Sequence, residues 1–473
     1  MPPRAFPTSY RRLFAAPGAA AFTLAGLLGR LALSMTGVSL VVLLSERRGS
    51  YGLAGTVSAA GLVTGAIGMP LIGRLVDRYG QARVTVPATL YNAVPLTGLL
   101  LCVRFGAPDW TLYLCSAACA ASPNLGGMAR SRWAHLYRDD PAARHLANSF
   151  EQALDELCFM AGPVLAMLLC TTLAPEAGLI TAGTLGTTGA LLFAAQRRTE
   201  PPLPPAPAPE PGPGPGPGAA GPRHGSPLRV PGLRVLVLTF LATGMVFGAT
   251  EITTVAYADA LGHKAAAGAL LGLVAAGSCL AGLLFGLLTP RRAPGVRFLT
   301  GAAAMAAVLL LPLAAGLGGA GLGVLGVVLF TAGTATAPTM VTGMTLVQEL
   351  LPQRQFNEGM AMAVSGIVVG ISAGAALAGT VAEHAAPGTG YALPASAAAV
   401  ALLIALTGRR HLRAGGSSAS GPEPGAGTEA TPGSGSGSGS GSAPAPGSVN
   451  FPAPSGACGA AAENSERAVS ASV

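Results

Sequence analysis

Long apolar runs separated by short polar loops recur along the chain from Gly18 to Leu406. Most are about 20 residues or longer, the length that a helix needs to cross a hydrocarbon layer roughly 30 Å thick. None shows the alternating pattern of a barrel strand, and a helix satisfies its own backbone hydrogen bonds in lipid. The pattern predicts an all-α membrane protein with twelve transmembrane helices. The predicted spans are Gly18–Leu44, Gly52–Ile72, Val84–Val103, Trp110–Ala129, Ser149–Leu173, Glu176–Ala195, Leu233–Ala258, Ala265–Leu288, Phe298–Leu317, Gly321–Val347, Gly359–Ala382 and Gly390–Leu406.

Composition agrees with this class, since hydrophobic residues make up 51% of the chain and charged residues 10%. The formal net charge of +8 comes from basic residues scattered over short loops, which argues against nucleic-acid binding. Six of the 7 cysteines fall inside predicted spans, and only Cys458 lies outside them. No spacing indicates a disulfide framework or a set of metal ligands, so we expect neither a metal nor a cofactor.

Basic residues divide unevenly between the two sets of loops. An excess of arginine and lysine marks the cytoplasmic side of a membrane protein. The sequence therefore predicts the inner (plasma) membrane, with both termini in the cytoplasm. The richer set of loops holds Arg4, Arg11, Arg12, Arg74, Arg78, Arg83, Arg130, Arg132, Arg138, Arg144, Arg291, Arg292, Arg297 and Arg354, and the opposite set holds only Arg47, Arg48, Arg104 and Lys264.

The chain contains two related halves. An offset of 213 residues pairs Gly73 with Gly286 and Arg78 with Arg291, and a duplicated six-span unit is typical of secondary transporters. Pro, Gly and Ala dominate the stretch between the halves, which cannot bury a core. We expect a cytoplasmic N-terminus (1–17), two six-helix pseudo-repeat bundles (18–195 and 232–410), a disordered cytoplasmic linker (196–231) and a disordered cytoplasmic tail (411–473).

One basic residue, Arg30, falls in the middle of the first span. A charge at that depth costs at least roughly 2.5 kcal/mol and needs a partner or water. Thr23, Arg30 and Ser34 share one helical face, which predicts a polar stripe lining a cavity. A structural arginine that locks this span to a neighbour is the alternative.

The fifth span opens with Glu151, Asp155 and Glu156. We expect Asp155 to be the counter-ion of the first-span arginine or a carboxylate that exchanges protons. The alternative for Asp155 and Glu156 is a static ion pair with Arg130 or Arg132. Glu151 is expected to lie near the cytoplasmic boundary, where water reaches it.

The second half also carries polar groups inside its spans. Glu251 is the remaining lone acid, and it borders a threonine stripe that includes Thr243 and Thr250. Such a carboxylate is a candidate proton-coupling site, or it hydrogen-bonds a neighbouring helix. Thr334 and Pro338 of the tenth span are predicted to line the substrate cavity, with ordinary helix contacts as the alternative.

The hairpin between the second and third spans carries the pattern Gly-x-x-x-Asp-Arg-x-Gly, as Gly73, Asp77, Arg78 and Gly80. It resembles the signature loop of the major facilitator superfamily. The resemblance implies that these four residues form a latch that holds the cytoplasmic side closed. Asp77 would cap a helix terminus, and Arg78 would reach a carboxylate such as Glu358.

The sequence Ala161-Gly162-Pro163 looks like a reduced form of the Gly-Pro signature of drug antiporters. The mid-span arginine of those antiporters is not matched, because Arg130 and Arg132 are predicted at the cytoplasmic end of the fourth span. The resemblance implies a monomeric secondary transporter in the lipid bilayer that exports a small organic solute in exchange for protons. A proton-coupled importer and a transport-inactive receptor or scaffold stay open. No enzyme motif is present.

Overall fold

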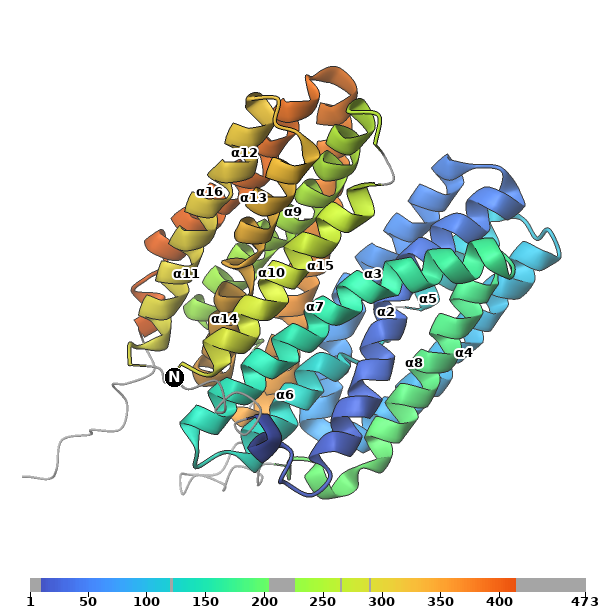
Figure 1. Ribbon diagram of the computed structural model, residues 1–473. Coiled ribbons are helices and arrows are strands. Elements are labelled where there is room, and N and C mark those ends of the chain that lie inside the picture. The colour runs from blue at the N-terminus through green and yellow to red at the C-terminus, as the bar shows by residue number, and fades with distance from the viewer. Residues whose placement is uncertain (1–9, 120–121, 204–225, 264–265, 289–290, 414–473) are drawn as a thin grey trace, which may run out of the picture. The chain divides into compact units, whose positions relative to one another are not determined.

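The computed structural model describes residues 10–119, 122–203, 226–263, 266–288 and 291–413. These residues belong to one compact unit, and every regular element among them is a helix (Figure 1). The helices are α2 (Ala19–Arg48), α3 (Tyr51–Tyr79), α4 (Gln81–Arg104), α5 (Asp109–Ala118), α6 (Leu125–Leu136), α7 (Pro141–Thr172), α8 (Ala177–Ala195), α9 (Pro231–Ala260), α10 (Ala267–Gly286), α11 (Pro294–Val308), α12 (Leu310–Leu317), α13 (Leu322–Gly333), α14 (Thr336–Leu350), α15 (Phe356–His384) and α16 (Ala392–Thr407), with short 3-10 turns η1 (Arg197–Thr199), η2 (Pro227–Arg229), η4 (Gln353–Gln355), η5 (Pro387–Tyr391) and η6 (His411–Arg413).

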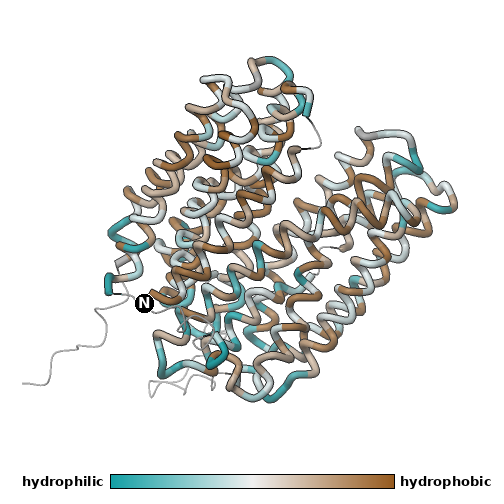
Figure 2. Tube along the Cα trace, in the orientation of Figure 1, coloured by the Kyte–Doolittle hydropathy of each residue, from teal (hydrophilic) through white to brown (hydrophobic). Residues whose placement is uncertain are grey.

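Eleven stretches of helix in the described part of the chain are long and apolar enough to cross a membrane. In Figure 2 these helices are largely brown, and teal residues gather in the loops at their ends. α11 with α12 and α13 with α14 each count as one such stretch. Together with an interrupted fourth span, the arrangement agrees with the predicted twelve-helix fold.

The fourth predicted span, Trp110–Ala129, is wrong as a continuous helix. It consists of α5 and α6, and Pro123 and Asn124 lie between them. Proline has no N–H for a helical hydrogen bond. The Asn124 side chain accepts a hydrogen bond from the backbone N–H of Gly127 (3.0 Å), so it caps the second segment. The span also ends later than predicted, at Leu136.

The charged hairpin is almost entirely helical, although the predicted spans left it outside the helices. α3 continues to Tyr79 and α4 begins at Gln81, so Gly80 alone separates them. Gly80 has a φ of 94°, a backbone conformation that favours glycine. Because α3 continues, Gly73 and Asp77 share one helical face.

The helices form two groups, coloured blue to green (α2–α8) and yellow-green to red (α9–α16) in Figure 1. In the first group α2 packs against α7 and α8, and in the second α9 packs against α15 and α16. The groups meet where α3 contacts α15 and where α7 contacts α10 and α14. Glycines allow close packing within a group, since a Cβ on Gly244 or Gly370 would overlap a backbone oxygen of the facing helix, α15 or α9.

Parts of the predicted linker and tail are ordered. Thr199 of η1 is buried, and Glu200 accepts a hydrogen bond from the backbone N–H of Ala82 at the start of α4 (3.0 Å). Leu412 of η6 is buried as well. The disordered linker and tail are therefore wrong at their edges, because these edges cap and cover helix ends. The remainder, 204–225 and 414–473, lies outside the described residues, as do 1–9 of the predicted N-terminus.

Candidate functional site

Helix α7 carries the acidic residues of the site, and its start explains their environment. Pro141 occupies the first helical turn, and Asp140 accepts a hydrogen bond from the backbone N–H of Ala143 (2.9 Å). Both features favour a helix N-terminus. The helix therefore begins about two turns before the predicted start at Ser149. Glu151 consequently lies deep in the packing with a fully buried side chain, and the prediction that water reaches it is wrong.

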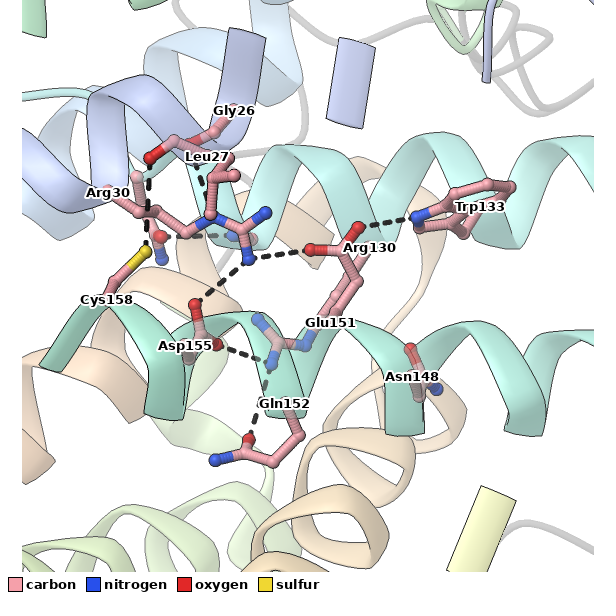
Figure 3. Close-up of polar contacts among 12 residues, drawn as sticks. Gly26, Leu27, Arg30, Arg130, Trp133, Asn148, Glu151, Gln152, Asp155 and Cys158 are labelled. Carbon is pink, nitrogen blue, oxygen red and sulfur yellow. Dashed lines mark hydrogen bonds and ion pairs between the residues drawn. The ribbon is translucent and has the colours of Figure 1, made fainter. Parts of the chain in front are cut away.

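Arg30 of α2 reaches two carboxylates of α7 (Figure 3). Its Nη1 lies 2.7 Å from Oε2 of Glu151 and 3.0 Å from Oδ1 of Asp155, and its Nε donates to the carbonyl oxygen of Gly26 (3.2 Å). Trp133 of α6 donates from its indole nitrogen to the other oxygen of Glu151 (2.6 Å). The predicted pairing of Arg30 with Asp155 is present.

A second arginine, Arg130 of α6, binds the same aspartate (Figure 3). Its Nη2 donates to Oδ2 of Asp155 (2.7 Å) and to Oε1 of Gln152 (3.4 Å). Arg130 and Arg30 are 2% and 8% exposed, so both charges are buried. The two predicted alternatives for Asp155 therefore hold together, because it pairs with the first-span arginine and with one arginine of the fourth span.

Glu156 connects these groups to the second half of the molecule. Gln152 donates from Nε2 to Oε1 of Glu156 (3.1 Å), and the hydroxyl group of Ser278 on α10 lies near the Glu156 carboxyl group. The Ser278 hydroxyl in turn accepts a hydrogen bond from Thr336 of α14 (2.8 Å). A chain of polar contacts thus runs from α2 through α6 and α7 to α10 and α14.

We call Arg30, Arg130, Glu151, Asp155 and Glu156 the buried charge cluster. It contains two guanidinium groups and three carboxyl groups. Glu151 and Asp155 lie within ion-pair distance of arginine, whereas in the described part of the chain Glu156 accepts a hydrogen bond from an amide and lies near a hydroxyl group. Removing one partner of a buried ion pair costs about 3–5 kcal/mol. Glu156 can therefore take up a proton with less loss of ion pairing than Asp155.

The other arginine of α6, Arg132, has a different environment. Its guanidinium group donates to the carbonyl oxygens of Phe193 (3.0 Å) and Gln196 (2.9 Å) and to the hydroxyl of Thr199 (2.9 Å). These carbonyls lie at the C-terminal end of α8, where a cation is favourable. Arg132 therefore fastens α6 to α8, and the predicted alternative of its pairing with Asp155 is wrong.

Two residues predicted to line a cavity are engaged in helix contacts. Ser34 donates to the carbonyl oxygen of Cys158 on α7 (2.8 Å), where Gly162 leaves room for it. Thr243 is fully buried and donates to the carbonyl oxygen of Thr239 (2.9 Å). The hydroxyl group of Ser34 thus bonds to α7 and that of Thr243 to the preceding turn of its own helix. A role of either residue in a cavity stays a prediction.

The other four residues predicted to line a cavity are either buried or partly exposed. Thr23 and Thr250 are buried, and neither hydroxyl has a hydrogen-bond partner among the described residues. Thr334 and Pro338 are partly exposed near the junction of α13 and α14, and Thr334 donates to the carbonyl oxygen of Thr331 (2.7 Å). A contact of these residues with a solute stays a prediction.

Glu251 of α9 is exposed, and none of the ion pairs of the described residues involves it. The exposed apolar side of the same helix is marked by Leu238, which is 52% exposed. At 100° per residue, Glu251 and Leu238 are roughly 140° apart around the helix axis. Glu251 therefore faces away from the side on which Leu238 is exposed.

The predicted latch on α3 meets the N-terminus of α15. Oδ1 of Asp77 accepts a hydrogen bond from the backbone N–H of Asn357 (3.0 Å), and Oδ2 accepts one from that of Glu358 (2.9 Å). Asp77 thus caps α15, where a carboxylate is favourable, and the predicted capping contact is present. Gly73 lies against the same turn, since a Cβ there would be 2.7 Å from the carbonyl oxygen of Asn357.

The basic partner of Glu358 is Arg74. Its Nε and Nη2 donate to the two carboxylate oxygens at 3.0 Å and 2.6 Å, a bidentate arrangement. Arg78 instead stacks on the ring of Tyr79, 5.2 Å from its centre. The predicted contact between Arg78 and Glu358 is wrong, because the continuing helix puts Arg74 on the face that meets α15.

Comparison with known proteins decides the family. The model of the Major Facilitator Superfamily matches residues 22–360, most of the chain. The chain belongs to the major facilitator superfamily. It is a multi-pass membrane transporter of a solute and not an enzyme.

Relatives within the superfamily are distant. The uncharacterized MFS-type transporter y4rN of Sinorhizobium fredii (strain NBRC 101917 / NGR234) is 29% identical over 383 residues, which cover 79% of this chain and 90% of that protein. The human organic anion transporter MFSD10 (TETRAN) has 16% identity and a TM-score of 0.60, with 82% and 98% of the two chains covered. The E. coli fucose:proton symporter has 16% identity and a TM-score of 0.57, with the same coverage. At this low sequence identity, the structural similarity shows that the folds are alike and says nothing about the substrate.

The sequence predicts that the fourth span ends at Ala129, with Arg130 and Arg132 at its cytoplasmic end. The helix continues instead to Leu136, and both arginines lie buried within α6. The apolar run ends at Ala129, and hydropathy alone therefore ends the span there. The neutralising contact with Asp155 is a tertiary contact that hydropathy does not contain.

Sequence analysis also missed three residues around the buried charge cluster. Gln152 could have been found, because it precedes Glu156 by four residues, a spacing that pairs side chains on a helix. Trp133 and Ser278 reach α7 from α6 and α10. Their positions depend on how the helices pack, which the spacing within one helix does not indicate.

Proposed function

We propose that this superfamily member is a proton-coupled exporter of a small organic solute that works by alternating access, as a monomer in the inner membrane with both termini in the cytoplasm. The supporting observation is the polar chain from Arg30 to Thr336, which joins the buried charge cluster in one half to α10 and α14 in the other. Separation of α7 from α10 would break the contact between Glu156 and Ser278. In this proposal the protonation of Glu156 and the conformation are therefore coupled.

Glu156 is the proposed proton carrier, in preference to Asp155. A proton on Asp155 would weaken hydrogen bonds to two buried guanidinium groups. A proton on Glu156 leaves two carboxylates opposite two guanidinium groups, so the cluster becomes neutral. Glu251 is the second candidate, because its carboxyl group is exposed and away from the side of Leu238.

The proposed cycle has two steps. Ionised Glu156 accepts a charge-assisted hydrogen bond from Ser278 and stabilises the conformation in which α7 contacts α10. Protonation weakens this bond, and cargo that binds between the halves favours the other conformation. The outward direction of cargo is supported by the likeness of Ala161-Gly162-Pro163 to the drug-antiporter signature.

A proton-coupled importer is the second candidate function. It is favoured by one protein of similar fold, which is a fucose:proton symporter. The two candidates share the proposed role of Glu156 and differ in whether protons and cargo cross in opposite directions or together. A transport-inactive receptor or scaffold would move neither.

The test uses the full-length protein in proteoliposomes of known orientation that contain a pH-sensitive dye. Candidate solutes are screened for proton movement across the vesicle membrane. We expect Glu156→Gln to reduce solute-coupled proton flux at least about tenfold, and Glu251→Gln to reduce it less. Glu46→Gln is the matched control, since Glu46 is exposed at the end of α2. Undiminished coupled flux in both span variants would refute the coupling assignment, and proton movement with the solute instead of against it would establish import.

A further inference from the structure

Three of the four basic residues on the predicted external side gather in one place. Arg47, Arg48 and Arg104 line a cavity of about 330 Å³ at the ends of α2 and α4, and Glu176 before α8 is part of its wall. We call it the external arginine cavity. It lies within the first half of the molecule and shares no residue with the buried charge cluster.

Two of these arginines have partners within the protein. Arg48 donates from Nη2 to the carbonyl oxygens of Cys102 (3.0 Å) and Ala107 (2.6 Å), which fixes the turn after α4 and neutralises that helix end. Arg47 lies 2.7 Å from Glu176. Both side chains therefore shape the cavity wall.

Arg104 supplies the uncompensated charge. It is exposed, and it makes no hydrogen bond or ion pair with the other residues that the structure describes. The ion pair with Arg47 lowers the pKa of Glu176, and the charge of Arg104 lowers it further, so Glu176 is ionised. With Asp109, which lies 3.7 Å from Arg48, the surroundings hold three positive and two negative charges.

Exposed aromatic residues flank the cavity. Phe105 follows Arg104 directly and is 79% exposed, and Trp110 near the start of α5 is 65% exposed. Exposed aromatic side chains at the ends of membrane helices lie at the depth of lipid headgroups. The phosphate of a headgroup is the anion at this depth, and guanidinium groups bind phosphate in a bidentate manner.

We propose that the external arginine cavity binds a phosphate ester, with Arg104 as its principal ligand. The volume is at the small end of ligand sites, which suits a headgroup-sized anion. Arg47 joins Arg104 when the anion competes with Glu176 for it. The phosphate ester comes from an anionic phospholipid of the outer leaflet or from a soluble compound, and the two sources share this chemistry.

The test measures the midpoint of thermal unfolding of the full-length protein in detergent while phosphatidylglycerol or, separately, glycerol 3-phosphate is added. We expect a concentration-dependent rise in the midpoint that weakens at high salt. Arg104→Gln should raise the half-effective concentration about tenfold. Arg292→Gln, which changes an exposed arginine on the opposite predicted side, should leave it unchanged. A response to phosphatidylglycerol alone identifies the lipid as the source, and a response to glycerol 3-phosphate alone identifies a soluble phosphate ester. A response to both supports a site for the phosphate group that the two compounds share.

A second variant separates binding from damage to the fold. Glu176→Gln removes the competing negative charge and frees Arg47, so we expect it to lower the half-effective concentration severalfold. A misfolded protein would not bind more tightly. The proposal is overturned if Arg104→Gln and Glu176→Gln both respond like the unchanged protein to both compounds, or if neither compound shifts the midpoint of the unchanged protein.

Discussion

The internal repeat relates Gly73 of α3 to Gly286 of α10, and each glycine lies against the other half of the molecule. A Cβ on Gly73 would be 2.7 Å from the backbone oxygen of Asn357 at the start of α15. A Cβ on Gly286 would be 2.7 Å from Cβ of Ser149 on α7 and equally close to the hydroxyl of Tyr10. The repeat thus places a close approach between halves at two equivalent positions, the α3–α15 contact and the α7–α10 contact.

The two contacts differ in their chemistry. At the α3–α15 contact, Asp77 and Arg74 bring charges to the end of α15. At the α7–α10 contact, the position equivalent to Arg74 is Leu287, and His145 and Tyr10 instead hydrogen-bond to carbonyl oxygens of α10 (3.0 Å and 2.7 Å). Charge contacts depend on protonation and salt, whereas bonds to carbonyl groups do so less. We therefore expect the α3–α15 contact to break and re-form during transport and the part of the α7–α10 contact around Gly286 to act as a pivot, while the contact of Glu156 with Ser278, about two turns away along α10, opens.

The largest effect should follow from Asp77→Asn. The carboxylate accepts hydrogen bonds from two backbone N–H groups of α15 and from Nδ2 of Asn357 (2.8 Å). A hydrogen bond to a charged group contributes about 1.5–3 kcal/mol, so the closed contact should weaken about 10- to 100-fold. Hydrogen exchange of the peptide 353–363 would report this directly, because one of the two capped backbone N–H groups of α15 loses its acceptor and the other loses a charged one. Asp139→Asn, at an exposed loop position, is the control, and unchanged protection in Asp77→Asn would show that the cap contributes nothing.

Substitution of the two equivalent glycines should come next. Gly73→Ala places a methyl group against the backbone of α15, which cannot move without shifting the helix, and such overpacking costs about 1–3 kcal/mol. Gly286→Ala meets side-chain atoms of Ser149 and Tyr10, which can adjust at lower cost. We expect Gly73→Ala to impair solute flux and the protection of α15 more strongly than Gly286→Ala does. Equal effects of the two substitutions would show that the α3–α15 and α7–α10 contacts have the same importance for solute flux.

Substitution of Arg74 should have a smaller effect, but a larger one than the same substitution of Arg78. Arg74→Gln removes the bidentate partner of Glu358, but the Arg74 side chain is 52% exposed, so solvent screens the pair. We expect exchange in the first turn of α15 to rise about threefold to tenfold, with a difference that shrinks at high salt. Arg78→Gln is the matched control four residues further along α3. A larger effect of Arg78→Gln than of Arg74→Gln would instead support the predicted pairing of Arg78 with Glu358.

The spans and their grouping could be predicted from the sequence, because length and hydropathy decide them locally. The errors occurred where charged residues continue a helix. The predicted second span stops at Ile72, yet α3 runs to Tyr79, since contacts with α15 satisfy Arg74 and Asp77. Helix α6 likewise continues beyond the predicted end, because Asp155 of α7 pairs with Arg130 and carbonyl oxygens at the end of α8 accept hydrogen bonds from Arg132. A prediction from hydropathy ends a span at a charged residue, whereas in the folded protein a charged residue with a partner can lie inside a helix and be buried.

The candidate site was predictable in most of its residues and in the pairing of Arg30 with Asp155, but not in its other pairs. Arg30 and Asp155 are visible as charges within apolar runs, and helical spacing puts Glu151 and Asp155 on one face. Which arginine binds which carboxylate depends on the packing of α2, α6 and α7. The spacing within one helix also cannot show that Glu156 turns toward α10, because that contact belongs to the other half of the molecule.

The smallest effect should come from the amide pair of Asn148 and Gln348, which joins α7 to α14 beside the α7–α10 contact. Each side chain donates to the other, at 3.0 Å and 3.1 Å. Neutral hydrogen bonds contribute about 0.5–1.5 kcal/mol each, so a double-mutant cycle of Asn148→Ala and Gln348→Ala in thermal unfolding should give a coupling of about 1 kcal/mol. Because neither partner is charged, this coupling should not change with salt, unlike the Arg74–Glu358 pair. If the coupling did depend on salt, the proposed difference between the charged α3–α15 contact, which breaks and re-forms, and the neutral contact, which acts as a pivot, would not hold.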